Sequence, residues 1–214
     1  IVLGHAWISN DRYLDDLIET VARDDLKLWI HVPDILYATR RGTFDVDTAA
    51  TYTRRLETIL ALADTVITIS AQSRAQITAF AQARGFRPNI CQVTLGVPSQ
   101  AHTDNVPARL VNGSGPFVLY VASMSERKRH EFLIEAWRRA RDESDQVAAA
   151  RLVLVGQPLP GFERFRDHAF HKKLAQSGIT VINECDADQL AQLYRQSAFT
   201  VYPSAAEGWG LPPV

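Results

Sequence analysis

The chain has 214 residues, of which 46% are hydrophobic and 22% are charged, the balance of an ordinary globular protein that can build its own core. Its formal net charge of -1 at pH 7 argues against a broad basic surface, so we expect no nucleic acid among its partners. Cys91 and Cys185 stand far apart and form no CxxC pair, which favours two free thiols over a disulfide or a metal site.

Short runs rich in Val and Ile alternate with stretches of helical period along the chain. The predicted strands span 1–3, 28–32, 66–70, 90–95, 117–122, 152–155, 179–182 and 199–202. These runs are nearly continuous in their hydrophobicity, as in strands that are buried on both faces. Three apolar stripes of helical spacing lie between them: Leu14, Leu17, Ile18 and Val21; Phe132, Leu133, Ala136, Trp137 and Ala140; Leu190, Leu193 and Tyr194. The alternation predicts βαβ units with parallel sheets.

The alternation stops in GVPSQAHTDNVPARLVNGSGP, residues 96–116, which is rich in Pro, Gly, Ser and Asn. We interpret this stretch as a linker between two α/β halves, with a boundary near Val106. The predicted domains are therefore 1–106 and 107–214, each with about four strands, which is few for a complete doubly wound sheet.

A basic triplet, Arg-Lys-Arg at 127–129, follows a predicted strand in SMSERKRHEF. We expect a helix to begin at Ser125 or Glu126, which would place three cations in its first turn. Cations there cost roughly 0.3–1 kcal/mol each, because a helix N-terminus already carries partial positive charge. Phosphate binds at such termini, and ligands of parallel sheets bind at the carboxyl ends of strands. The triplet thus predicts an anion site; the alternative is a solvated helix start paired with Glu126 or Glu131.

A second motif, YPSAAEGWGLPPV, closes the sequence. It places a carboxylate and two glycines after the last predicted strand, and glycine allows close approach of the backbone to a ligand. A lone GxG is no dinucleotide fingerprint, because the third glycine is missing, so a nicotinamide dehydrogenase is disfavoured. An ordinary tight turn would explain the glycines but not the carboxylate.

Together, LYVASMSERKRHEFLIEAW and YPSAAEGWGLPPV resemble the C-terminal domain of retaining glycosyltransferases with the GT-B fold, family 4 or "group 1". LADTVITISAQSRAQI and VTLGVPS resemble the end of that family's N-terminal domain, so the likeness runs from about Leu28 onward. The resemblance implies an α/β fold of two Rossmann-like domains facing a cleft, each incomplete in this chain. The first would lie on the acceptor side, and the second would bind a nucleotide sugar.

The resemblance also implies roles for individual residues. Arg127 and Lys128 match the basic pair that grips the donor diphosphate, whereas Arg129 falls where the family often has a neutral residue. Glu207 matches the first glutamate of the family's E-x7-E motif, which contacts the donor sugar. The family's glycine-rich loop beside the sugar and phosphates matches three residues here, Gly208, Trp209 and Gly210.

His31 in LWIHVPD matches a histidine that the family carries after an N-domain strand, near the sugar and acceptor. The alternative is a packed or solvated histidine, and Asp34 would be a candidate hydrogen-bond partner that orients the ring. We expect His31 and Glu207 to be the catalytic residues. The second glutamate of E-x7-E falls at the position after Val214, so the sequence is either part of a longer protein or a remnant.

The chemistry calls for cations because negative charge builds on the diphosphate as it leaves the anomeric carbon. The basic pair can stabilise that charge, so we expect no metal and no other cofactor beside the nucleotide-sugar donor. FDVD at 44–47 has the Asp-x-Asp spelling of a metal-binding element, but it precedes a helix, so Asp45 or Asp47 is expected to be a helix cap.

The resemblance implies a metal-independent hexosyltransferase that moves a sugar, with retention, from a nucleotide-diphosphate donor to a hydroxyl of a glycan or glycolipid acceptor. A mannosyl- or rhamnosyl-type enzyme of polysaccharide biosynthesis is favoured by the PRKN-like form of the triplet. The alternatives are a non-catalytic nucleotide-sugar-binding or scaffold domain of the same fold, and another GT-B enzyme such as a phosphorylase or epimerase. We expect a cytoplasmic location that allows peripheral association with the inner face of a membrane.

Overall fold

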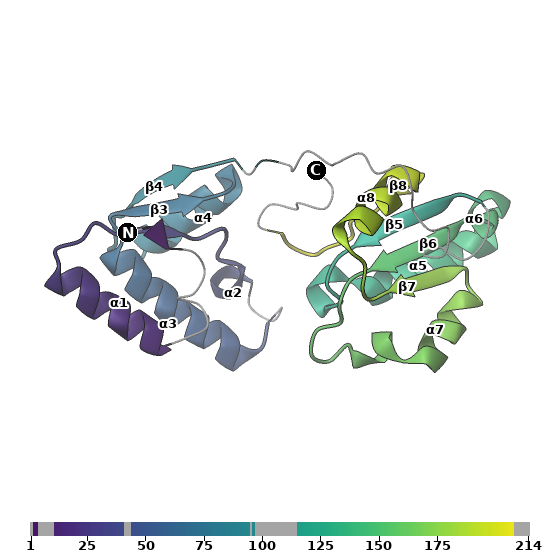
Figure 1. The fold of residues 1–214 in the computed structure, drawn as a ribbon, viewed down its shortest axis with the longest axis horizontal. Helices are drawn as coiled ribbons and strands as arrows, with labels where there is room; N and C mark the ends of the chain where they lie inside the picture. Colours follow the sequence, from purple (N-terminus) through teal and green to yellow (C-terminus); the bar gives the residue numbers. More distant parts are fainter. Residues whose placement is uncertain (1, 4–10, 41–43, 95, 97–114, 208–214) are drawn as a thin grey trace. The chain divides into compact units, whose positions relative to one another are not determined.

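The structure is a computed structural model, and it describes residues 2–3, 11–40, 44–94, 96 and 115–207. The described residues up to Gly96 form one compact unit, and residues 115–206 belong to a second. We call these the N-terminal unit and the C-terminal unit. Both units consist of a parallel sheet with helices (Figure 1). The predicted boundary near Val106 lies outside the described residues, so it stays a prediction.

The N-terminal unit contains a four-stranded parallel sheet in the order β1-β2-β3-β4. Its strands are β1 (Val2–Leu3), β2 (Trp29–His31), β3 (Thr65–Thr68) and β4 (Asn89–Gln92). Its helices are α1 (Asp11–Arg23), α2 (Leu36–Thr39), α3 (Val46–Leu62) and α4 (Ala71–Gln82). A crossover helix thus precedes each new strand, which is why every strand pair is parallel.

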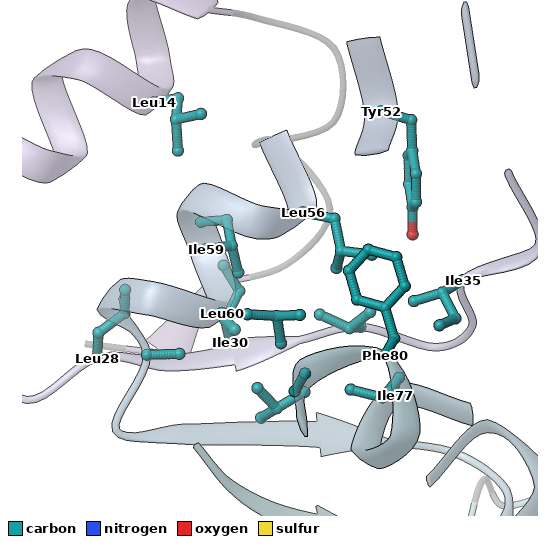
Figure 2. Packing of buried hydrophobic residues seen from close by; sticks show 14 of the residues in the cluster. Leu14, Leu28, Ile30, Ile35, Tyr52, Leu56, Ile59, Leu60, Ile77 and Phe80 are labelled. Carbon is teal, nitrogen blue, oxygen red and sulfur yellow. The ribbon is translucent and has the colours of Figure 1, made fainter. Parts of the chain in front are cut away.

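One hydrophobic cluster joins these helices to the sheet. Figure 2 shows Leu56, Ile59 and Leu60 of α3 beside Ile30 of β2. All four side chains are at most 2% exposed, so the apolar face of α3 holds it on the sheet. α1 adds Leu14 to the same cluster.

The C-terminal unit contains a second parallel sheet, in the order β7-β6-β5-β8. Its strands are β5 (Phe117–Val121), β6 (Arg151–Val155), β7 (Ile179–Ile182) and β8 (Phe199–Thr200). The helices between them are η2 (Glu126–Lys128), α5 (His130–Glu143), α6 (Asp145–Ala149), η3 (Glu163–Arg166), α7 (His168–Ala175) and α8 (Ala187–Gln196), with η marking 3-10 helices.

Both faces of this second sheet are covered. Val118 and Tyr120 of β5 belong to a cluster with α5, η3 and α7, whereas Phe117 and Leu119 belong to a cluster with Leu193 of α8. The chain runs from β5 outward to β7 with helices on one face, then returns through α8 on the other face to place β8 beside β5. This reversal makes the carboxyl edge between β5 and β8 a topological switch point, where ligands bind in open α/β sheets.

All eight predicted strands and their parallel pairing are confirmed, with ends shifted by a few residues. The stripes in α1 and α8 are also confirmed, because Leu14, Leu17 and Leu193 are buried. The stripe in α5 was partly wrong: Phe132 is 62% exposed, and the buried face carries His130, Leu133, Ile134 and Trp137. The indole of Trp137 donates to the carbonyl of Ser177 at 3.2 Å, which helps to fix this rotation of the helix.

Cys91 and Cys185 are both free thiols, as predicted. Among the described residues, no helix is both long enough and apolar enough to cross a membrane.

Candidate functional site

The candidate site lies at the carboxyl ends of β5 and β8, on the two chain segments that follow these strands. After β5, Ala122 to Ser125 lead into η2, which carries the predicted basic pair. After β8, Val201 to Ala206 lead to Glu207. β5 and β8 are paired through Val118 with Phe199 and Leu119 with Thr200, so the two segments leave the sheet as neighbours.

The predicted helix start at Ser125 or Glu126 is confirmed only in part, since the 3-10 helix η2 begins at Glu126 but the α-helix α5 begins at His130. The basic pair lies instead in the short η2 turn, and Arg129 has a left-handed backbone conformation with φ 54° and ψ 40°. This break lets His130 begin the buried face of α5. Arg127 and Lys128 therefore lie before the N-cap of α5, which is Arg129, and not within the first turn of that helix.

Arg127 joins η2 to the segment after β8. Its guanidinium Nη1 donates to the carbonyl of Ala206 at 2.5 Å, and its own carbonyl accepts from the amide of Ala205 at 2.9 Å. The Ala206 carbonyl belongs to the peptide group whose nitrogen is that of Glu207. Arg127 thus holds the backbone that leads into the predicted sugar-binding glutamate, although 79 positions separate it from Ala206.

Lys128 is only 7% exposed, which is unusual for a lysine and requires polar partners for its charge. Its Nζ donates to the hydroxyl of Tyr202 at 3.3 Å and lies 5.3 Å from the centre of that ring. The alternative of a solvated basic helix start is therefore wrong for Lys128. A cation held among aromatic groups at low exposure acts more strongly on a nearby anion than one in water.

Tyr120 also contacts the basic turn. It is fully buried in β5, and its hydroxyl donates to the carbonyl of Lys128 at 2.6 Å. The same hydroxyl lies 3.3 Å from the Oγ of Ser204. Tyr202 meets the Tyr120 ring edge-on at 5.7 Å. Tyr120, Tyr202 and Ser204 were not predicted as parts of the site; the only signal in the sequence was their position at or just after the ends of two predicted strands.

Arg129 is exposed, in line with the expectation that it differs from its two neighbours. Glu131 forms an ion pair with Arg164 of η3 rather than with the triplet. A pocket of about 430 Å³ opens beside Arg129 and is lined by Ser125, Glu126, His130, Glu131, Phe132 and Phe162 as well. Its two carboxylates disfavour phosphate, so this pocket is a poorer candidate for a diphosphate than the turn with Arg127 and Lys128.

His31 lies in the other unit, as the last residue of β2 and beside Ile67 of β3. It therefore also stands at the carboxyl edge of a parallel sheet. The carboxylate of Asp34 accepts from the amide of Leu36 at 3.0 Å and supports the start of α2. Asp45 accepts from the amide of Thr48 at 2.9 Å, so the prediction that FDVD provides a helix cap is confirmed.

The structure therefore brings Arg127 and Lys128 together with the segment that leads to Glu207. His31 belongs to the N-terminal unit. Gly208, Trp209 and Gly210 lie outside the described residues. Within the described part of the chain, no cluster of three or more His, Cys, Asp or Glu side chains could hold a metal ion.

His130 is a buried titratable group close to the basic turn. It is 0% exposed, packs between the rings of Tyr120 and Phe165, and makes no hydrogen bond through either ring nitrogen. Burial lowers its pKa from 6.5 to about 4. The nearby backbone of Ala122 acts against this shift, although it does not form a hydrogen bond with the ring, and the charge of Lys128 adds to the shift. The native state therefore holds a neutral imidazole at pH 7.

We expect His130→Phe to stabilise the protein at pH 7 by about 1–2 kcal/mol, because phenyl keeps the ring packing and removes two buried polar atoms without partners. Because the native pKa lies below the unfolded value, stability present above pH 6.5 is lost as pH falls toward 4, by up to about 3 kcal/mol. The Phe variant should lack this loss. Urea unfolding at pH 7, 6 and 5 measures both effects: no gain at pH 7 would contradict the first, and an equal pH slope in the two proteins would contradict the second.

The glycosyl transferases group 1 family model matches residues 103–214, which is more than half of the chain. No curated protein sequence matches the chain. Solved structures of similar fold include WaaG, described as a glycosyltransferase involved in lipopolysaccharide biosynthesis, with TM-score 0.67 and 14% identity over 99% of this chain and 63% of that one.

Two further similar structures are larger proteins. A variant of TarM from S. aureus, in complex with fondaparinux, alpha-GlcNAc-glycerol and UDP, has TM-score 0.58 and 14% identity over 86% of this chain and 34% of its own. A UDP-forming trehalose-phosphate synthase from Burkholderia xenovorans has TM-score 0.61 and 13% identity over 92% and 58%.

The chain thus spans between about one third and under two thirds of the length of these proteins. At such low identity the likeness concerns the fold, and it confirms the α/β GT-B class predicted from the sequence. The family is shown by the match that runs from before β5 to the end of the sequence and includes the basic turn: this chain belongs to the glycosyl transferases group 1 family.

Proposed function

We propose that this protein transfers a sugar from a nucleotide-diphosphate donor to a hydroxyl of a glycan or glycolipid acceptor. The observation that carries the proposal is the linkage of η2 to the segment after β8, through Arg127 to Ala206 and Lys128 to Tyr202. It brings two cations to the switch point of the C-terminal sheet, beside the chain segment that leads to Glu207. UDP in the complex of the similar TarM protein is in line with such a donor.

In this proposal the side chains act on the leaving group. Lys128 supplies a point charge and Arg127 a planar fork, and both stabilise the negative charge that develops on the diphosphate oxygen. Glu207 contacts the donor sugar, and Gly208, Trp209 and Gly210 form the loop beside the sugar and phosphates. His31 acts from the N-terminal unit on the sugar and acceptor.

Two finer features belong to the same proposal. The cations replace a divalent metal, so the reaction needs none. The anomeric configuration of the donor sugar is retained. A mannosyl- or rhamnosyl-type donor and an acceptor in polysaccharide biosynthesis fit the PRKN-like triplet, and a lipid-linked acceptor would bring the protein to the cytoplasmic face of a membrane.

Calorimetry of the full-length protein with UDP, GDP, ADP and dTDP tests the donor. We expect one of the four to bind at least about tenfold more tightly than its nucleoside, because a charge-assisted hydrogen bond to phosphate contributes about 1.5–3 kcal/mol. If none of the four binds, the protein does not use such a donor.

Turnover tests the reaction itself. Incubation with the matching nucleotide sugar and a hydroxyl acceptor should release the nucleoside diphosphate, and proton NMR of the product should give the anomeric configuration of the donor. Addition of EDTA should leave the rate within about twofold, because Arg127 and Lys128 carry the charge that a metal would otherwise supply. Loss of activity with EDTA and recovery with Mg²⁺ or Mn²⁺ would show that a metal is required. Binding without any release would favour a non-catalytic domain.

A further inference from the structure

We propose that Tyr120 is a positioning residue that sets the location of Lys128 and of the segment before Glu207 at the same time. The proposal rests on the proposed function above, because it concerns the same site. Tyr120 does not reach the ligand; it acts through one buried hydroxyl on which two chain segments converge. These segments are η2 and Tyr202 to Ala206, which are about 75 residues apart in sequence.

The contacts of the hydroxyl carry the inference. It donates to the Lys128 carbonyl at 2.6 Å and lies 3.3 Å from the Oγ of Ser204. Tyr120 is 0% exposed and its ring packs against His130 at 4.8 Å and Tyr202 at 5.7 Å, so packing of the ring restricts the position of the hydroxyl. A rigid hydroxyl that contacts both segments fixes the distance between them.

Two more hydrogen bonds complete the connection. The amide of Ala205 donates to the carbonyl of Arg127, and the guanidinium of Arg127 donates to the carbonyl of Ala206. Hydrogen bonds therefore join the backbone of η2 to the backbone before Glu207, and we call this contact the junction. The Tyr120 hydroxyl contacts both of its sides. A shift of the Lys128 carbonyl would move the lysine and the glutamate segment together.

Tyr120→Phe removes this hydroxyl and keeps the ring. A merely structural role would weaken the binding of every ligand alike. A positioning role predicts that the preference for a nucleoside diphosphate over the nucleoside falls about fivefold, the equivalent of one hydrogen bond, while affinity for the nucleoside stays within twofold. In turnover, the KM for the donor should rise more than kcat falls if the diphosphate contact is displaced in the bound substrate.

Tyr52→Phe is the matched control. Tyr52 is 4% exposed and its hydroxyl donates to the carbonyl of Asp34 at 2.8 Å, so the variant also removes a buried tyrosine–carbonyl bond, but in the N-terminal unit. It should lower the free energy of unfolding by a similar amount and leave the diphosphate preference unchanged. An equal loss of preference in the two variants would overturn the proposal.

Hydrogen exchange tests the junction without any nucleotide. In Tyr120→Phe, exchange of the Ala205 and Lys128 amides should accelerate together by about fivefold, whereas Tyr52→Phe should change neither. If the unaltered protein binds no nucleoside diphosphate, the proposed function fails, yet coupled exchange still supports the junction. If it binds the diphosphate and Tyr120→Phe alters neither preference nor exchange, the positioning role fails and the proposed function stands.

Discussion

Lys128→Ala is expected to weaken the binding of the donor nucleoside diphosphate by roughly 10- to 100-fold, the range that one charge-assisted hydrogen bond to phosphate represents. The reason is the low exposure of Lys128, which reduces competition by water for its ammonium group. Calorimetry with the diphosphate measures the effect, and the nucleoside serves as the reference ligand whose affinity should not change.

Two variants make this result specific. Lys128→Met keeps the length and packing of the side chain beside Tyr202 but removes the charge, so it should lose as much affinity as Lys128→Ala. Arg129→Ala removes a neighbouring cation that is exposed and lies outside η2, and it should leave the affinity within about twofold. An equal loss in Lys128→Ala and Arg129→Ala would show that the triplet acts as a general basic patch.

Of the substitutions proposed here in the C-terminal unit, we expect Gly156→Ala to lower the free energy of unfolding most. Gly156 follows the last residue of β6 and has φ +149°, and a Cβ there would lie 2.1 Å from the carbonyl oxygen of Ala122. The oxygen belongs to the backbone, which cannot rotate away as a side chain can. Strain in φ and the overlap each cost about 1–3 kcal/mol, so we expect a loss of roughly 2–6 kcal/mol in urea unfolding.

Gly161→Ala separates the two causes. Gly161 has φ +87°, but a Cβ there would meet no atom within 4 Å. This variant should therefore lose about 1–2 kcal/mol from backbone strain alone. If Gly156→Ala loses no more than Gly161→Ala, the close approach between the loops after β5 and β6 is not required for folding.

The expected loss at Gly156 concerns the site as well as the fold. Ala122, which a Cβ at Gly156 would strike, is the first residue of the connection from β5 to η2. The same connection is also hydrogen-bonded to the loop after β6. The amide of Met124 donates to the carbonyl of Gln157 at 2.8 Å, and the amide of Leu159 donates to the carbonyl of Met124 at 3.0 Å. The basic turn is thus held by backbone on two sides, by this loop and by the segment after β8.

The arrangement of strands covered by helices could be predicted from the sequence alone. A run such as Phe117 to Val121 is apolar at every position, and such continuity predicts a strand covered on both faces; the structure buries its odd and even positions in different clusters. The helix cap at Asp45 was also predicted, because a short polar side chain before a helix bonds locally to the backbone. These features depend on neighbours in the sequence, so a single chain is enough to predict them.

The tertiary structure decided the details of the site. Local sequence favoured a helix through Arg127, Lys128 and Arg129, but α5 begins only at His130, where burial against Tyr120 and Phe165 sets its first residue. The buried Lys128 donates to Tyr202, which is 74 positions away along the chain. Because β8 returns to pair with β5, these residues meet at the same edge of the sheet. Local propensities cannot predict such contacts, since they arise from the order of strands in space.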